Sequence, residues 1–144
     1  MTKPKDALAE AAVPRITLSP AALFAIAVGG ALGTVGRFLL DTTFSETAGH
    51  FPATTLLINL SGSFAIGLLV PLVDNSRRVS LLRPFLIVGL LGGWTTYSTL
   101  AVDAVTLTKD GHGVTAALSL AATVFGGLIL VMLGNVAGRR TARP

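Results

Sequence analysis

The stretch from Gly92 to Leu100 holds the residues of this chain that are best suited to ion chemistry. It reads Gly-Gly-Trp-Thr-Thr-Tyr-Ser-Thr-Leu and places five hydroxyl side chains in the middle of an apolar segment. Adjacent glycines and hydroxylated β-branched residues are poor helix formers. A backbone break at membrane depth is tolerated only where it is buried in protein or lines a cavity, and such breaks often mark ion sites. The stretch therefore predicts a broken helix at an ion site; the alternative is an unbroken helix whose small residues allow close packing.

Two further segments carry polar or small residues at every fourth position, which places them on one face of a helix. They are Thr55, Asn59, Ser63 and Gly67 in one segment and Thr115, Ser119, Thr123 and Gly127 in the other. The hydroxyl groups have a simpler explanation, which is that they hold membrane helices together. The amide of Asn59, however, carries two N–H donors that need partners. A face of hydroxyl and amide donors suits a small, hard anion whose hydration shell must be replaced.

Charged residues inside the apolar segments are scarce. Arg37, near the end of the first segment, either snorkels to the interface or raises the anion concentration at the mouth of a path. No Asp or Glu lies in the middle of a segment, although a proton-coupled exporter needs such a carboxylate. There is no cysteine, no nucleophile–base pair and no phosphate-binding loop, so no feature of the sequence supports an enzymatic function. The residues alone predict a small-ion channel or carrier, or a packing subunit.

The composition is that of an integral membrane protein. Of the 144 residues, 51% are hydrophobic and 12% are charged, whereas about a quarter of the residues in a soluble domain are charged. Four apolar segments of roughly 18 to 23 residues match a hydrocarbon core of about 30 Å. We expect a single all-α membrane domain with four transmembrane helices. They lie at about 21–40, 53–73, 85–102 and 114–136, after a disordered or surface tail over 1–19 and with a last loop at Asp103–Gly113.

The positive charges predict the orientation of these helices rather than nucleic-acid binding. With four spans, the two tails and the middle loop share one side of the membrane. That side holds nine Lys and Arg residues, against Lys109 alone on the other. Cytoplasmic loops are enriched in Lys and Arg, so we expect both termini to lie in the cytoplasm. The expected location of the protein is the plasma membrane.

The third segment resembles the Gly-Gly-x-Thr-Thr-Phe-Ser-Thr-Phe signature of the CrcB/Fluc fluoride channels. Three further pieces are similar and occur in the same order, so the resemblance covers about residues 29–134. The pieces are Gly30-Ala31-Leu32-Gly33 with Arg37-Phe38, the run from Phe51-Pro52 through Asn59 to Phe64, and the positions Ser119, Thr123 and Gly127.

The resemblance implies a fluoride-specific channel that exports fluoride passively and so lowers its toxic concentration in the cytoplasm. Its working unit would be an antiparallel dimer in the lipid bilayer. A structural sodium ion, which is not transported, would be held at the dimer centre by the backbone carbonyls of Gly92 and Thr95. The pore would be formed by Asn59, Tyr97, Ser98, Thr99, Ser119 and Thr123, with Arg37 in support.

The chain departs from the family pattern in two ways. In the family, two phenylalanine rings turn their partly positive edges toward the ion; here Tyr97 keeps an edge and adds a hydroxyl, whereas Leu100 has no ring. The charge bias also makes an antiparallel homodimer hard to form, so we expect a related, oppositely oriented chain as partner. The alternatives are a non-conducting partner subunit of a heterodimeric channel and a small multidrug exporter.

Overall fold

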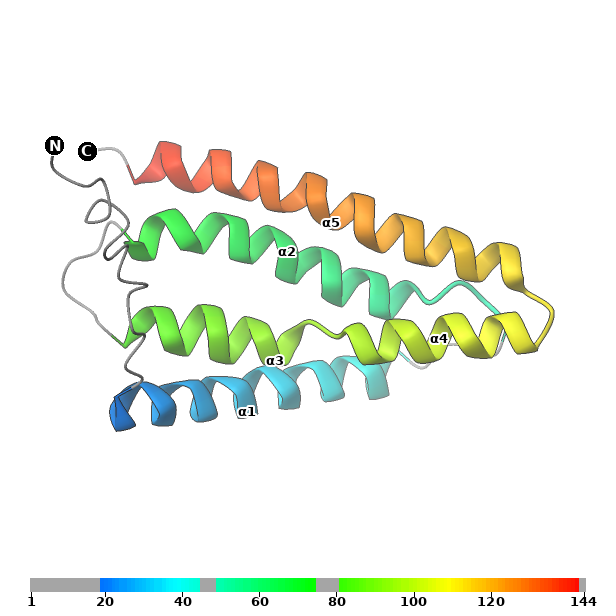
Figure 1. Cartoon of the computed structure of the whole chain (residues 1–144), viewed down its shortest axis with the longest axis horizontal. Helices are drawn as coiled ribbons and strands as arrows, with labels where there is room; N and C mark the ends of the chain where they lie inside the picture. Colours follow the sequence, from blue (N-terminus) through cyan, green and yellow to red (C-terminus); the bar gives the residue numbers. More distant parts are fainter. Residues whose placement is uncertain (1–18, 45–48, 75–80, 143–144) are drawn as a thin grey trace, which may run out of the picture.

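Four helical spans lie side by side and run the length of the molecule (Figure 1). The computed structural model describes residues 19–44, 49–74 and 81–142, so the expected tail lies outside the described residues except for Ser19. Each span is long and apolar enough to cross a membrane: Pro20–Thr43, Ala53–Asp74, Pro84–Lys109 and Gly113–Thr141. Within these residues there is no strand. The predicted fold class, an all-α protein with four membrane-spanning helices, is confirmed.

The first span packs against the first half of the third. Helix α1 (Pro20–Thr43) lies along η2 (Pro84–Leu91), a π-helix, and α3 (Gly92–Trp94). Glycines allow the two backbones to come into contact, because a Cβ on Gly29 would overlap the carbonyl oxygen of Phe85 and one on Gly33 that of Leu90. Close approach of this kind is the usual role of small residues between membrane helices.

The second and fourth spans form the other closely packed pair. Helix α2 (Ala53–Asp74) lies along α5 (Gly113–Thr141). Here too glycines meet backbone, since a Cβ on Gly67 would overlap the carbonyl oxygen of Val131 and one on Gly134 that of Phe64. Helix α4 (Tyr97–Lys109), the second half of the third span, packs mainly against α5. The third span thus contacts α1 with one half and α5 with the other.

The third span is interrupted between its two halves, in the stretch that the sequence singles out (Figure 1). Thr95 has φ −70° and ψ 150°, and Thr96 has φ −142° and ψ 116°, so both residues have an extended backbone. The helix resumes at Tyr97 because the side chain of Thr96 caps it, accepting a hydrogen bond from the amide of Thr99 at 3.1 Å. A threonine at this position stabilises a new helix start.

The helix of the third span continues beyond the predicted end of that span. The sequence places the end near 102 with a loop at Asp103–Gly113, whereas α4 extends to Lys109. At Asp103 this helix is joined to α2, since the carboxylate accepts a hydrogen bond from the hydroxyl of buried Thr55 at 2.7 Å. The chain turns only at Gly111, whose φ of +83° suits glycine. The fourth helix also ends at Thr141, beyond the predicted 136.

Candidate functional site

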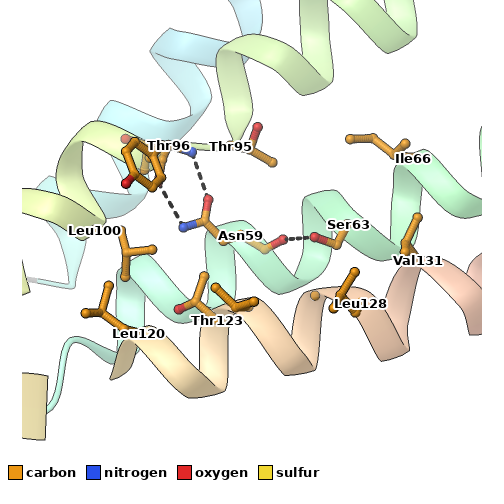
Figure 2. Close-up of a pocket in the computed structure, with 13 residues that line it drawn as sticks. Asn59, Ser63, Ile66, Thr95, Thr96, Leu100, Leu120, Thr123, Leu128 and Val131 are labelled. Carbon is orange, nitrogen blue, oxygen red and sulfur yellow. Dashed lines mark hydrogen bonds between the residues drawn. The ribbon is translucent and has the colours of Figure 1, made fainter. Parts of the chain in front are cut away.

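The side chain of Asn59 holds the backbone of Thr96 at the interruption. Its Oδ1 accepts a hydrogen bond from the Thr96 amide at 2.8 Å, and its Nδ2 donates to the Thr96 carbonyl at 2.9 Å (Figure 2). Both residues are buried, with 8% and 5% of their surface exposed. The amide therefore pairs with an extended residue as a neighbouring strand would, and it satisfies backbone groups that could not otherwise be buried.

This pairing and the cap by Thr96 together withdraw two hydrogen-bond donors from the helix. In a continuous α-helix the Thr96 amide would donate to the Gly92 carbonyl, and the Thr99 amide to the Thr95 carbonyl. Here the first donates to Asn59 Oδ1 and the second to Thr96 Oγ1. The carbonyls of Gly92 and Thr95 therefore lose their helical donors. A carbonyl released in this way at membrane depth needs another donor or a cation.

Arg37 supplies such a donor to a third carbonyl. Its Nε donates to the carbonyl oxygen of Gly93 at 3.3 Å, and its Nη1 lies 3.9 Å from Oδ2 of Asp41, one turn along α1. The arginine therefore contacts the interruption itself as well as the end of α1. The sequence leaves two roles open for Arg37, an anchor at the interface and a charge that attracts anions. The structure places its charge in a half-buried position beside the broken helix, which is compatible with both roles.

Helix α2 also fixes the residues just before the interruption. The indole Nε1 of Trp94 lies 3.1 Å from the carbonyl oxygen of Ile58 and 3.0 Å from Oγ of Ser61, and it donates to both. Gly62 leaves space for the Thr95 side chain, because a Cβ on this glycine would overlap the Thr95 methyl group. Helix α2 thus contacts both the residue before the interruption and the interruption itself.

A cavity of about 580 Å³ lies between α2, the interruption and α5 (Figure 2). Most of its lining is apolar, with a few amide and hydroxyl groups at one end. The hydroxyl oxygen of Thr123 is buried and has no hydrogen-bond partner among the described residues. A buried hydroxyl without a partner is uncommon and needs an explanation. The lining residues are Asn59, Ser63, Ile66, Thr95, Thr96, Tyr97, Leu100, Leu120, Thr123, Val124, Gly127, Leu128 and Val131.

The structure brings some of the residues predicted from the sequence together in this cavity. Asn59, Thr95, Tyr97 and Thr123 all line it. The ring of Tyr97 is also 82% exposed on the surface of the single chain. Leu100, in contrast, is 4% exposed and contributes an apolar wall to the cavity.

The other predicted residues lie outside the cavity lining. Ser98 and Thr99 surround the hydroxyl of Thr96, with oxygen–oxygen distances of 3.3 and 2.9 Å. Ser119 is buried in the helix packing, and its hydroxyl donates to the Ala116 carbonyl at 2.9 Å. Gly92 lies next to open space, since a Cβ there would meet no atom within 4 Å. Arg37 also lies apart from the cavity.

Sequence reasoning missed two residues that the geometry makes central. Thr96 organises the interruption through its amide, its carbonyl and its hydroxyl. A signal was present, because a threonine with Thr99 three residues later has the spacing of a helix cap and its third helical residue. The contact of Asp103 with Thr55 joins residues 48 positions apart. Nothing local in the sequence indicates that contact.

Comparison with known proteins identifies one family model and several similar proteins. The family model described as "CrcB-like protein, Camphor Resistance (CrcB)" matches residues 24–135. A Nocardia farcinica protein named "Fluoride-specific ion channel FluC 2" is 45% identical over 123 residues, which are 85% of this chain and 88% of the relative. Proteins named "Fluoride-specific ion channel FluC" from Chlorobium luteolum and Agrobacterium fabrum are 36% and 40% identical, covering 83% and 79% of this chain and 94% and 93% of theirs.

Proposed function

The chain belongs to the CrcB-like family, and on this premise we propose that it is a subunit of a fluoride-specific channel in the plasma membrane. The observation that carries the proposal is that relatives 36–45% identical over most of their length are named fluoride-specific ion channels. The matched range of 24–135 includes both Asn59 and the interruption at Thr95 and Thr96. Transport would be passive, so that fluoride leaves the cytoplasm down its electrochemical gradient.

The cavity contains the groups that a small anion needs when it loses water. One N–H of Asn59 Nδ2 is used by Thr96, and the second can donate to an ion in the cavity. Thr123 also lines this space, and its buried hydroxyl, which is unpartnered among the described residues, would supply a further O–H donor. Tyr97 adds a ring edge and a hydroxyl. Few donors in an apolar lining would bind fluoride strongly enough to dehydrate it but weakly enough to release it.

The interruption also fits a structural sodium ion. The carbonyls of Gly92 and Thr95 have lost their helical donors to Asn59 and Thr96, and hard cations prefer oxygen ligands. Open space beside Gly92 leaves room for a second subunit to approach. A bound sodium ion would supply a fixed positive charge that holds the released carbonyls of two subunits together. Within this chain, Asn59 and Thr96 would keep those carbonyls in position.

We propose that the second subunit is antiparallel and is a related chain rather than a second copy. Tyr97, which lines the cavity, is 82% exposed in the single chain and would be covered by such a partner. The charge bias of nine to one favours one orientation for this chain, with both termini in the cytoplasm. Fusing a reporter to each terminus tests this: labelling on both faces of the membrane, with a conducting homodimer, would contradict the two-chain arrangement.

One observation favours a second candidate, a non-conducting partner subunit. Leu100 places an apolar side chain in the cavity wall where the family signature has a phenylalanine. In that case the pore of the partner would carry the fluoride. Substitutions at Asn59 and Tyr97 of this chain would then leave transport unchanged, whereas matching substitutions in the partner would abolish it.

The proposed function can be tested in cells that lack their own fluoride exporter. We expect expression of this chain, with its partner where one is needed, to lower cytoplasmic fluoride and restore growth in fluoride-containing medium. The matched control is the same pair carrying Tyr97→Ile in this chain, at a position that is exposed in the single chain. Growth that does not improve, with both chains present in the membrane, would contradict the proposal.

A further inference from the structure

The cavity beside Asn59 continues along α5 toward the end of that helix. The α5 residues that line it recur every three or four positions and so share one face, ending at Val131. A second, shallower hollow of about 380 Å³ begins at the same Val131 and is lined by Val131, Met132, Asn135 and Val136. The two hollows share Val131 as a lining residue, and the second extends to Asn135, near the end of the bundle where α1 begins (Figure 1). We refer to the two hollows together as the path.

A positive charge is held over this end of the path. The Nε of Arg139 donates to Oδ1 of Asn135 at 2.7 Å. Long side chains on a helix lean back over the preceding turn, so the guanidinium group extends toward Asn135, which lines the hollow. Asn135 itself lies on the side of α5 that faces α2, because a Cβ on Gly67 would come within 3.0 Å of the Asn135 backbone nitrogen.

The charge of Arg139 makes this end of the path more attractive to anions. Both α2 and α5 end here, and the C-terminus of a helix carries a partial negative charge. Asp74, at the end of α2, lies 3.3 Å from Arg83 and is neutralised by it. Arg139 is in neither of the two ion pairs between described residues, so its charge remains available.

We propose that Asn135 and Arg139 form a capture site for small inorganic anions at the end of the path. The guanidinium group would concentrate fluoride there and offset the helix termini, and the Asn135 amide would hold the guanidinium in place and offer an N–H. This inference deepens the proposed function and rests on it. The simpler alternative is that Arg139 only anchors the helix end at the interface, as any basic residue there would.

Arg140 provides a matched control. It is the next residue, has the same charge and is exposed, but it lies about 100° further around the helix. In vesicles containing the conducting channel, we expect Arg139→Gln to slow fluoride efflux about two- to threefold at low ionic strength, and Arg140→Gln to leave it near wild type. The difference should disappear at about 1 M of an impermeant salt, where charges are screened. Arg139→Lys should recover most of the rate.

A second measurement does not require conduction. Because the chain has no cysteine, Val131→Cys places a single thiol at the residue that both hollows share. Its reaction rates with an anionic and a cationic methanethiosulfonate report the local potential. We expect Arg139→Gln to lower the anionic-to-cationic ratio several-fold and Arg140→Gln to leave it unchanged. A ratio that Arg139→Gln does not alter would overturn the capture site, even in a chain that conducts. A wild-type channel that does not conduct, with the ratio altered as expected, would instead overturn the proposed function.

Discussion

Asn59 and Thr96 are joined by a pair of hydrogen bonds, of 2.8 and 2.9 Å, between a side-chain amide on α2 and a backbone residue in the interruption of the third span. One side chain thereby satisfies both polar groups of an extended residue at membrane depth. The same pairing removes the helical donor of the Gly92 carbonyl and places an amide N–H at the edge of the cavity. Structure and proposed transport therefore depend on the same contact.

Replacing Asn59 with leucine should destabilise the protein strongly. The amide and carbonyl of Thr96 would both stay buried without partners, at a cost of about 1–3 kcal/mol each. The fluorescence of Trp94, the only tryptophan, gives the unfolding transition in detergent. Ser63→Ala is the control, since it removes only a bond of 2.8 Å to the Asn59 carbonyl within α2. Equal midpoints for the two variants would show that the pairing contributes little.

The hydroxyl of Thr96 should be worth about 1 kcal/mol to the start of α4. It caps the helix by accepting from the Thr99 amide at 3.1 Å. Thr96→Val keeps the shape and the β-branching but removes the cap, whereas Thr96→Ser keeps the cap. In the same unfolding assay we expect Thr96→Val to lower the midpoint and Thr96→Ser to stay closer to wild type. The reverse order would contradict the capping role.

A methyl group on Gly33 should not be accommodated. It would overlap the carbonyl oxygen of Leu90, a backbone atom that cannot move aside without separating α1 from η2. Overpacking of this kind costs about 1–3 kcal/mol. Gly113→Ala is the control, because a Cβ at the start of α5 meets no atom within 4 Å. The prediction is checked by the yield and unfolding midpoint of the two variants, and a Gly33→Ala protein as stable as Gly113→Ala would disprove it.

The ring of Tyr97 should matter more than its hydroxyl. An aromatic edge carries partial positive charge and can solvate an anion. We expect Tyr97→Phe to retain most of the fluoride efflux and Tyr97→Ile to lose about tenfold, since the loss of one favourable contact of about 1.4 kcal/mol gives that factor. Leu100→Phe, which adds a second edge in the cavity wall, should raise the rate. A faster Tyr97→Ile channel would be incompatible with ring-edge solvation.

The spans and the place of the interruption could be predicted from the sequence because their causes are local. Four long apolar runs have few alternatives in a chain with 12% charged residues. Gly92 and Gly93, followed by Thr95 and Thr96, weaken a helix whatever surrounds them. The sequence also places a boundary at the charged residue Asp103, whereas α4 continues to Lys109.

The contacts that give the site its geometry could not be predicted in the same way. Asn59 and Thr96 are 37 residues apart, and their pairing follows from how α2 packs beside the interruption. The same holds for Arg37, whose Nε reaches the carbonyl of Gly93 from 56 residues away. Ser119 has the spacing of a pore residue, but it is buried between packed helices and its hydroxyl donates to the Ala116 carbonyl of its own helix. Spacing shows which residues share a face and not what that face contacts.

The most direct test of the account is fluoride efflux from potassium-loaded vesicles, started with a potassium ionophore and followed with a fluoride electrode. The assay compares the wild-type channel with one carrying Asn59→Asp, which still accepts from the Thr96 amide but cannot donate to its carbonyl or to an anion. We predict rapid fluoride efflux for the wild type, retention of chloride in a parallel assay, and loss of most of the fluoride efflux for Asn59→Asp. Chloride efflux as fast as that of fluoride, or an Asn59→Asp channel as fast as wild type, would contradict the account.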